Sequence, residues 1–310
     1  MDNCLAAWHD CQRVERRTMS ASTRTRISRS PSLTVRMVVV AVLTPLAAIV
    51  LLAAVVIFLP SRFLVGLAIA LTIGTVVRLL AHRKRKPPPG VTLTEHDDPE
   101  LFAVVDRLCA LADIPRPGLV LSDQRQPNSW VVHLPHQTPR LYLTTGLREL
   151  LTLDELQAVL GHELTHIANR DALVMSVVGM PGSIMLRASG GGVDGMLVVT
   201  IGMLSQIGTA ILSRYRELAA DAGSAAITGR PSALASALLK VSDSFQQVPA
   251  KDLRAAAALN AFNLVAVPRH RRWGWPRSQL LERITATHPP LQARLNVLFE
   301  LERVQHSRYA

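Results

Sequence analysis

Two histidines and a glutamate in the run GHELTH form the pattern HExxH, with His162 and His166 flanking Glu163. In an α-helix, positions i and i+4 lie on one face, so both histidines can hold one Zn²⁺ from the same side. Glu163 directly follows the first histidine, where a carboxylate can act as general base toward the attacking water. The pattern therefore favours the chemistry of a zinc-dependent peptidase, with one Zn²⁺ per chain.

The residues before this pattern predict the helix that must carry it. Residues 153–160 (LDELQAVL) place apolar side chains at helical period. Thr152 is the expected N-cap, and Glu155 is its expected partner in a capping box. The alternative for the five-residue pattern alone is a solvated helix face without a metal. The strength of the helix signal favours the metal site.

A third ligand is needed, because catalytic zinc takes three protein ligands and keeps one position for water. The best candidate is Glu217, and Asp221 follows it at i+4 on the same helical face. We expect Glu217 to bind the metal and Asp221 to accept a hydrogen bond from the outer ring nitrogen of a ligating histidine, preferably His162. The alternative is an acidic pair on an amphipathic helix, paired with Arg214 and Arg216.

Three segments together resemble a known family. They are GHELTHIANRD (161–171), SRYRELAAD (213–221) and THPP (287–290). They look like the three signatures of the HtpX heat-shock proteases, integral-membrane zinc metalloproteases related to the CAAX prenyl proteases and the mitochondrial Oma proteases. The resemblance extends from about Met37 to about Leu298. It implies His162, His166 and Glu217 as metal ligands and Glu163 as the base.

The resemblance also implies a place for the substrate. Asn128, Ser129 and Trp130 lie where the family has its substrate-side strand. A peptide substrate is expected to add to this edge as a further strand. The family's activity implies turnover of misfolded or damaged membrane proteins. A prenyl-peptide protease is disfavoured, because that relative has more membrane spans than the four candidates found in this sequence.

His288, in the THPP segment, is a further candidate for the site. The prolines keep it out of a helix interior. Its ring can donate a hydrogen bond to the oxyanion of a tetrahedral intermediate. The alternative is a loop histidine that caps the following helix, and the sequence leaves both roles open. Arg294, on that helix, is expected to pair with a carboxylate of the site.

Four apolar segments are candidate transmembrane helices. The first, Met37–Leu59, has 23 residues without a charge, enough to span ~30 Å of hydrocarbon. The second is Phe63–Ala81, and the short linker between them predicts a helical hairpin. Residues 172–186 and 195–213 form the second pair. Because His166 and Glu217 must reach one metal, the chain between them crosses the bilayer twice or not at all, and we favour a second hairpin.

Basic residues predict the orientation of these spans. Residues 1–36 hold seven arginines from position 13 onward, residues 78–86 hold five basic residues, and the linker between the first two spans holds only Arg62. By the positive-inside rule, both termini and the catalytic domain are cytoplasmic at the cell membrane, inner or plasma. The formal net charge of +11 accompanies no nucleic-acid motif, so nucleic acid is not an expected partner.

The predicted fold is a mainly α membrane protein with an α+β zincin-like catalytic domain of the gluzincin type. Residues 1–36 form a basic disordered tail, 37–81 a transmembrane hairpin, and 82–310 a cytoplasmic domain interrupted by the apolar hairpin 172–213. A small sheet is expected from strands at 118–122, 129–133 and 140–144, and helices from residues 98–111, 232–242 and 290–301.

The predicted function is that of a membrane-embedded zinc endopeptidase, acting on membrane or misfolded proteins at the cytoplasmic side in membrane protein quality control. Its expected partners are protein or peptide substrates and the lipid bilayer. The alternative is a catalytically silent zinc-binding membrane scaffold. Glu163 argues against the scaffold, because a structural zinc site needs no base beside its ligands.

Overall fold

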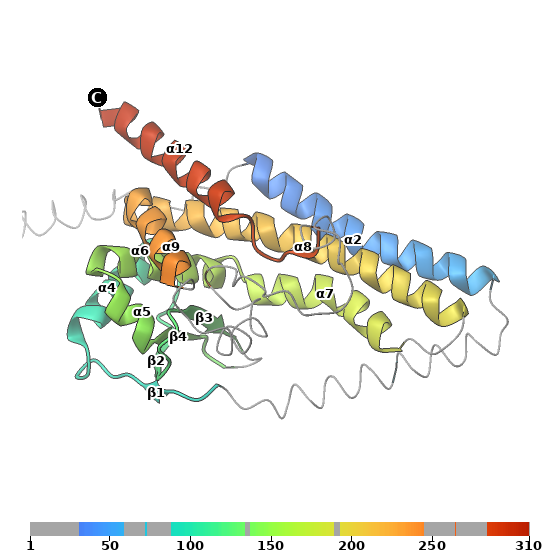
Figure 1. The fold of residues 1–310 in the computed structure, drawn as a ribbon, viewed down its shortest axis with the longest axis horizontal. Coiled ribbons are helices and arrows are strands. Elements are labelled where there is room, and N and C mark those ends of the chain that lie inside the picture. The colour runs from blue at the N-terminus through green and yellow to red at the C-terminus, as the bar shows by residue number, and fades with distance from the viewer. Residues whose placement is uncertain are drawn as a thin grey trace, which may run out of the picture.

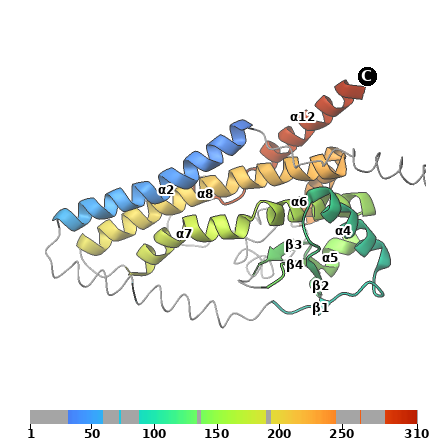
Figure 2. The ribbon, with the colours of Figure 1, turned by 180° about the vertical axis from the view of Figure 1, so that it is seen from behind.

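The computed structural model describes residues 31–58, 88–133, 137–188, 193–244 and 284–309, with the single positions Thr72 and Leu264. Three long helices lie along one another and extend from a smaller body that holds the sheet (Figure 1). They are α2 (Pro31–Phe58), α7 (Asp171–Ala188) and α8 (Val193–Thr228). The view from behind shows the same arrangement, with α8 running from the far end of the long helices into the smaller body (Figure 2).

The sheet has the strand order β1-β2-β4-β3. Strands β2 (Gly118–Ser122), β3 (Ser129–Val132) and β4 (Arg140–Thr144) lie where the sequence predicts them, although β3 ends one residue early. The short strand β1 (Val91–Thr92) was not predicted, nor was the parallel pairing of β2 with β4. Since β3 pairs antiparallel with β4 and is last in the order, it forms one edge of the sheet.

Helix α6 (Leu153–Ala168) lies at the centre of the smaller body. The predicted capping box between Thr152 and Glu155 is present at its N-terminus. Every residue from Glu155 through Thr165 is buried, because other elements cover the helix on several sides. The other elements in the described part of the chain are α4 (Pro99–Ala112), α5 (Thr145–Leu150), α9 (Pro231–Ser244) and α12 (Leu291–Tyr309).

Helices α6 and α8 approach each other closely, and two glycines permit it. A Cβ at Gly223 would lie 2.4 Å from Cγ2 of Thr165, a distance that real side chains do not tolerate. A Cβ at Gly161 would lie 3.1 Å from Oγ of Ser224. That hydroxyl donates a 2.6 Å hydrogen bond to the carbonyl oxygen of Ala158. The backbone contact between α6 and α8 therefore fixes the spacing of the histidine-bearing and glutamate-bearing helices.

The boundaries of α2 and α8 differ from the segments that the sequence predicted. Helix α2 begins at Pro31, inside the segment 1–36 that was assigned to a disordered tail, and proline fits the first turn of a helix. The apolar segment 195–213 and the predicted ligand Glu217 lie on one continuous helix, α8. Residues 1–30 and the linkers 60–62 and 189–192 lie outside the described residues, as do 63–81 apart from Thr72.

No helix within the described part of the chain is long and apolar enough to cross a membrane.

Candidate metal centre

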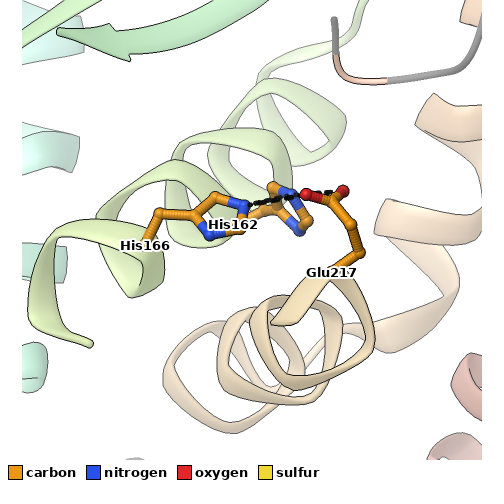
Figure 3. A group of neighbouring side chains, drawn as sticks. All are labelled: His162, His166 and Glu217. Atoms are coloured by element: carbon orange, nitrogen blue, oxygen red, sulfur yellow. Dashed lines mark hydrogen bonds and ion pairs between the residues drawn. The ribbon is translucent and has the colours of Figure 1, made fainter. Parts of the chain in front are cut away.

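Two neighbouring helices bring three donor side chains together. Helix α6 carries His162 and His166 on one face, and α8 directs Glu217 toward them (Figure 3). The two Nε2 atoms of the histidines are 3.1 Å apart. Glu217 places Oε2 3.7 Å from Nε2 of His162 and Oε1 3.6 Å from Nε2 of His166. One donor atom from each residue lies within 4.8 Å of the other two, close enough together to bind one metal ion.

The outer nitrogen of His162 faces a buried carboxylate. Its Nδ1 lies 2.9 Å from Oδ1 of Asp221, one turn beyond Glu217 on α8. Arg294 of α12 donates two hydrogen bonds to this carboxylate, from Nη2 to Oδ1 at 2.6 Å and from Nε to Oδ2 at 2.8 Å. Arg294 is 1% exposed and Asp221 is fully buried. Burial alone raises the pKa of Asp221, but Arg294 and His162 outweigh it and lower this pKa.

The outer nitrogen of His166 also faces a carboxylate, which the sequence analysis missed. Its Nδ1 lies 2.5 Å from Oδ2 of Asp171, the first residue of α7. Arg216, which the sequence analysis considered only as a partner of an acidic pair on α8, places Nη2 2.6 Å from the same oxygen. The available signal was the position of Asp171 at the end of the GHELTHIANRD segment.

These outer contacts favour a metal between the ligands. With a carboxylate beside each Nδ1, the proton of each neutral imidazole belongs on Nδ1, and the lone pair is on Nε2. The two Nε2 atoms of His162 and His166 then face each other and the Glu217 carboxylate without a proton to share. Such converging lone pairs repel unless a cation lies between them. Two histidines and a glutamate are a donor set of catalytic Zn²⁺ sites.

The charges around the ligands also favour a cation. Burial alone raises the pKa of Glu217, but His288, His166 and His162 outweigh it, so that the pKa lies well below its usual range. Burial alone lowers the pKa of His166, yet Asp171 and Glu217 raise it overall. At the ring of His166, the carboxylates of Asp171 and Glu217 therefore favour a positive charge, which either a proton or a metal ion can supply.

Glu163 is the buried acidic residue directly after His162, and its partner lies on the edge strand. Oγ of Ser129, at the start of β3, donates a 2.7 Å hydrogen bond to Oε1 of Glu163. Of the three predicted strand residues, Ser129 hydrogen-bonds Glu163 through its side chain. Trp130 instead stacks on Tyr142 of β4, with ring centroids 5.1 Å apart.

Asn128 holds the start of the edge strand in place. Its backbone N–H donates to the hydroxyl of Thr144, and its side-chain oxygen accepts a 3.0 Å hydrogen bond from the backbone N–H of Leu264. The carbonyl of Leu264 in turn accepts a 2.6 Å hydrogen bond from Nη1 of Arg294. A single backbone position therefore connects the edge strand to the arginine that holds Asp221.

His288 lies in the cluster, against the third donor. Its Nδ1 is 3.3 Å from Oε2 of Glu217, and the residue is 7% exposed. Arg214 of α8 reaches the chain just before it, with Nη1 at 3.5 Å from the carbonyl of Ile284 and 3.4 Å from that of Ala286. The contact with Glu217 was not among the roles considered from the sequence.

The comparisons with known proteins agree with this geometry. The model of peptidase family M48 matches residues 95–302, more than half of the chain. The chain belongs to peptidase family M48. The resemblance to HtpX proteases that the motifs indicated is thereby confirmed, and the family together with the His–His–Glu cluster supports a metalloprotease.

Two curated relatives and one solved structure illustrate the similarity. A protease HtpX homolog of Moorella thermoacetica is 38% identical over 236 residues, which cover 70% of this chain and 76% of the relative. Protease HtpX homolog 1 of Streptomyces coelicolor is 35% identical over 300 residues, which cover 89% and 94%. The crystal structure of S. mikatae Ste24p matches with a TM-score of 0.52 at 17% identity, covering 85% of this chain and 67% of that one, so this M48 chain shares its fold.

Proposed function

We propose that this M48 peptidase is a membrane-embedded zinc endopeptidase that cleaves membrane or misfolded proteins on the cytoplasmic side. The observation that carries the proposal is the convergence of His162, His166 and Glu217 on one point beside Glu163. A peptidase family with this donor set requires both a metal and a base. Three candidate metal ligands and a carboxylate suited to act as the base lie in one buried cluster at the contact of α6 and α8.

The chain's own residues supply the proton transfers and the orientation. Zinc, when bound, supplies Lewis acidity toward the attacking water and the scissile carbonyl. Glu163 accepts the proton of the water and passes it to the leaving amine. Ser129 fixes one oxygen of that carboxylate and leaves the other for the water. His288 is proposed to donate to the oxyanion that develops on the carbonyl.

The edge of the sheet provides the place for a peptide. Strand β3 pairs with β4 on one side and is the last strand in the order of this sheet. An extended substrate that pairs with residues 129–132 lies beside Glu163, because Ser129 bonds this residue directly. Main-chain pairing of this kind selects unfolded segments over folded ones. It therefore suits the turnover of misfolded proteins.

The apolar exterior of the long helices supports a bilayer as the surroundings. Large apolar side chains are more than a third exposed on α2, α7 and α8. They are Val35, Val38, Val39, Val42, Leu43, Leu46, Ile49, Val50, Leu173, Val177, Met203 and Leu204. Together with the uncharged run Met37–Leu59 and the arginines around it, they support a multi-pass protein with cytoplasmic termini.

Topology is tested by labelling with a membrane-impermeant thiol reagent in a variant without native cysteines. Ser61→Cys is expected to react from outside intact cells and Gln137→Cys to be protected. Reaction of Gln137→Cys from outside would overturn the cytoplasmic placement while leaving the metal site untouched.

Activity is tested on detergent-purified protein by zinc content and casein cleavage. Wild type is expected to hold one zinc per chain and to cleave, and chelator to abolish cleavage. Glu163→Gln is expected to keep zinc and lose turnover, whereas Glu217→Ala loses the metal. Zinc binding without any cleavage by wild type would favour the silent scaffold. Full zinc occupancy in Glu217→Ala would show that the third ligand is another residue.

A further inference from the structure

The two histidines of the metal centre have matching outer contacts built from different parts of the chain. Behind His162 stand Asp221 and then Arg294, and behind His166 stand Asp171 and then Arg216. In both sets a buried carboxylate faces Nδ1 and a buried guanidinium faces the carboxylate. Asp171 is 3% exposed and Arg216 is 7% exposed, so neither is a solvated surface charge.

The second set is placed by the two helices of the apolar hairpin. Asp171 is the first residue of α7, and Arg216 lies on α8 directly before the ligand Glu217. The turn after α6 makes this possible, because Arg170 adopts a left-handed backbone conformation with φ 55°. The chain thereby folds back so that Asp171 reaches the ring of His166, which it approaches to 2.5 Å.

A carboxylate at this position does two things to an imidazole. It keeps the proton on Nδ1, and it holds the ring so that the Nε2 lone pair has one direction. The carboxylate itself is costly to bury, so it needs a compensating charge. Arg216 provides it, because its Nη2 lies 2.6 Å from Oδ2 of Asp171 and both side chains are buried.

We propose that Asp171 and Arg216 are positioning residues of the metal centre, which orient His166 for zinc and thereby make metal affinity depend on the packing of α7 and α8. This inference rests on the proposed zinc peptidase function. It differs from a structural ion pair that only ties α7 to α8, because such a pair contributes to folding and leaves the affinity of the folded protein for zinc unchanged.

The test is the zinc dissociation constant of detergent-purified full-length protein, measured by chelator competition, beside the melting temperature of the zinc-free form. Asp171→Asn keeps the size of the side chain and removes its charge. It is expected to weaken zinc binding about 10- to 100-fold, the usual effect of losing such a partner. Arg216→Gln is expected to weaken zinc binding in the same direction. Asp154→Asn, at an exposed carboxylate on the first turn of α6, is the matched control with unchanged affinity.

A double variant and a conservative replacement distinguish the positioning role from a purely structural one. Because Arg216 acts through Asp171, the losses of the two single variants are expected to be non-additive in Asp171→Asn/Arg216→Gln. Arg216→Lys keeps the charge and is expected to recover part of the affinity that Arg216→Gln loses. If Asp171→Asn does not fold, the Arg216 variants still decide the question by the same measurement.

Two results would overturn the inference. One is a zinc dissociation constant within twofold of wild type in folded Asp171→Asn or in Arg216→Gln, with only the zinc-free melting temperature lowered. The other is simple additivity in the double variant. A wild-type protein that binds no zinc would instead overturn the proposed function itself, so the two failures are distinguishable.

Discussion

Gly223→Ala is the smallest change that should separate the metal ligands. The added Cβ would lie 2.4 Å from Cγ2 of Thr165 and 2.7 Å from its Oγ1. Carbon atoms in contact prefer about 3.5–4.0 Å, so α6 and α8 must move apart by roughly 1 Å or Thr165 must turn. Turning is hindered, because Thr165 is fully buried and β-branched, and its hydroxyl donates to the carbonyl of Gly161 at 2.8 Å.

Stability and metal binding should respond differently to Gly223→Ala. Overpacking costs about 1–3 kcal/mol, while alanine gains about 1 kcal/mol over glycine in a helix, so the net loss of stability is at most about 2 kcal/mol. Metal–ligand distances tolerate only about 0.2 Å. A helix separation of roughly 1 Å therefore weakens zinc binding at least about tenfold and lowers casein turnover about 100-fold.

The assay compares Gly223→Ala with a matched glycine replacement. A Cβ at Gly179 of α7 would meet Cγ2 of Thr209 at 3.4 Å, an ordinary contact, so Gly179→Ala should bind zinc as wild type does. Adding Thr165→Ala to Gly223→Ala removes both clashing atoms and should restore most of the affinity. If Gly223→Ala binds zinc as tightly as Gly179→Ala, the argument that the close helix contact sets the ligand spacing is refuted.

Three further predictions concern the base, the histidine of the THPP segment, and acid stability. Ser129→Ala removes the 2.7 Å hydrogen bond to Glu163. A hydrogen bond to a charged group contributes about 1.5 kcal/mol, so turnover should be about tenfold slower while zinc is retained. Loss of zinc from this variant would contradict the prediction. His288→Ala should keep zinc and lower turnover about 100- to 1000-fold as an oxyanion donor does, and an unchanged rate would reject that role. Burial alone raises the pKa of Glu155, but hydrogen bonds from Lys240 and other donors bring it down to about 2, below its usual 4.5. Its ionised form therefore stabilises the fold above about pH 4.5, and this stabilisation is lost as the pH falls toward about 2. In denaturant unfolding, the stability difference between wild type and Lys240→Met should be largest above about pH 4.5 and shrink on acidification; a constant difference would contradict it.

The elements that carry the site were predictable where local signals were strong. The capping box at Thr152 and the apolar period behind it located α6, and the short apolar runs within 118–122 and 140–144 located two strands. The spacing of Glu217 and Asp221 on one helical face located two residues of the cluster. The parallel pairing of β2 with β4 depends on contacts distant in sequence, and no short-range pattern in these strands encodes it.

Asp171 escaped prediction for a different physical reason. It stands five residues after His166, a spacing that places two side chains on different faces of a continuous helix. The helix, however, ends at Ala168, and the left-handed turn at Arg170 redirects the chain toward the histidine ring. A non-glycine residue at positive φ is uncommon, so the periodicity argument had no reason to expect this turn. Its role became visible only with the backbone.

Because α8 is one continuous helix, a movement at its apolar end is transmitted to the metal ligand that it carries. The helix has 36 residues from Val193 to Thr228, about 54 Å at 1.5 Å per residue. If it tilts about its contact at Gly223, the distance to Val193 is about 45 Å and the distance to Glu217 about 9 Å. A displacement of about 5 Å at the apolar end then moves the ligand carboxylate by about 1 Å. By reciprocity, a metal bound at Glu217 resists that tilt, so lateral forces on the apolar end and occupancy of the metal centre are thermodynamically linked.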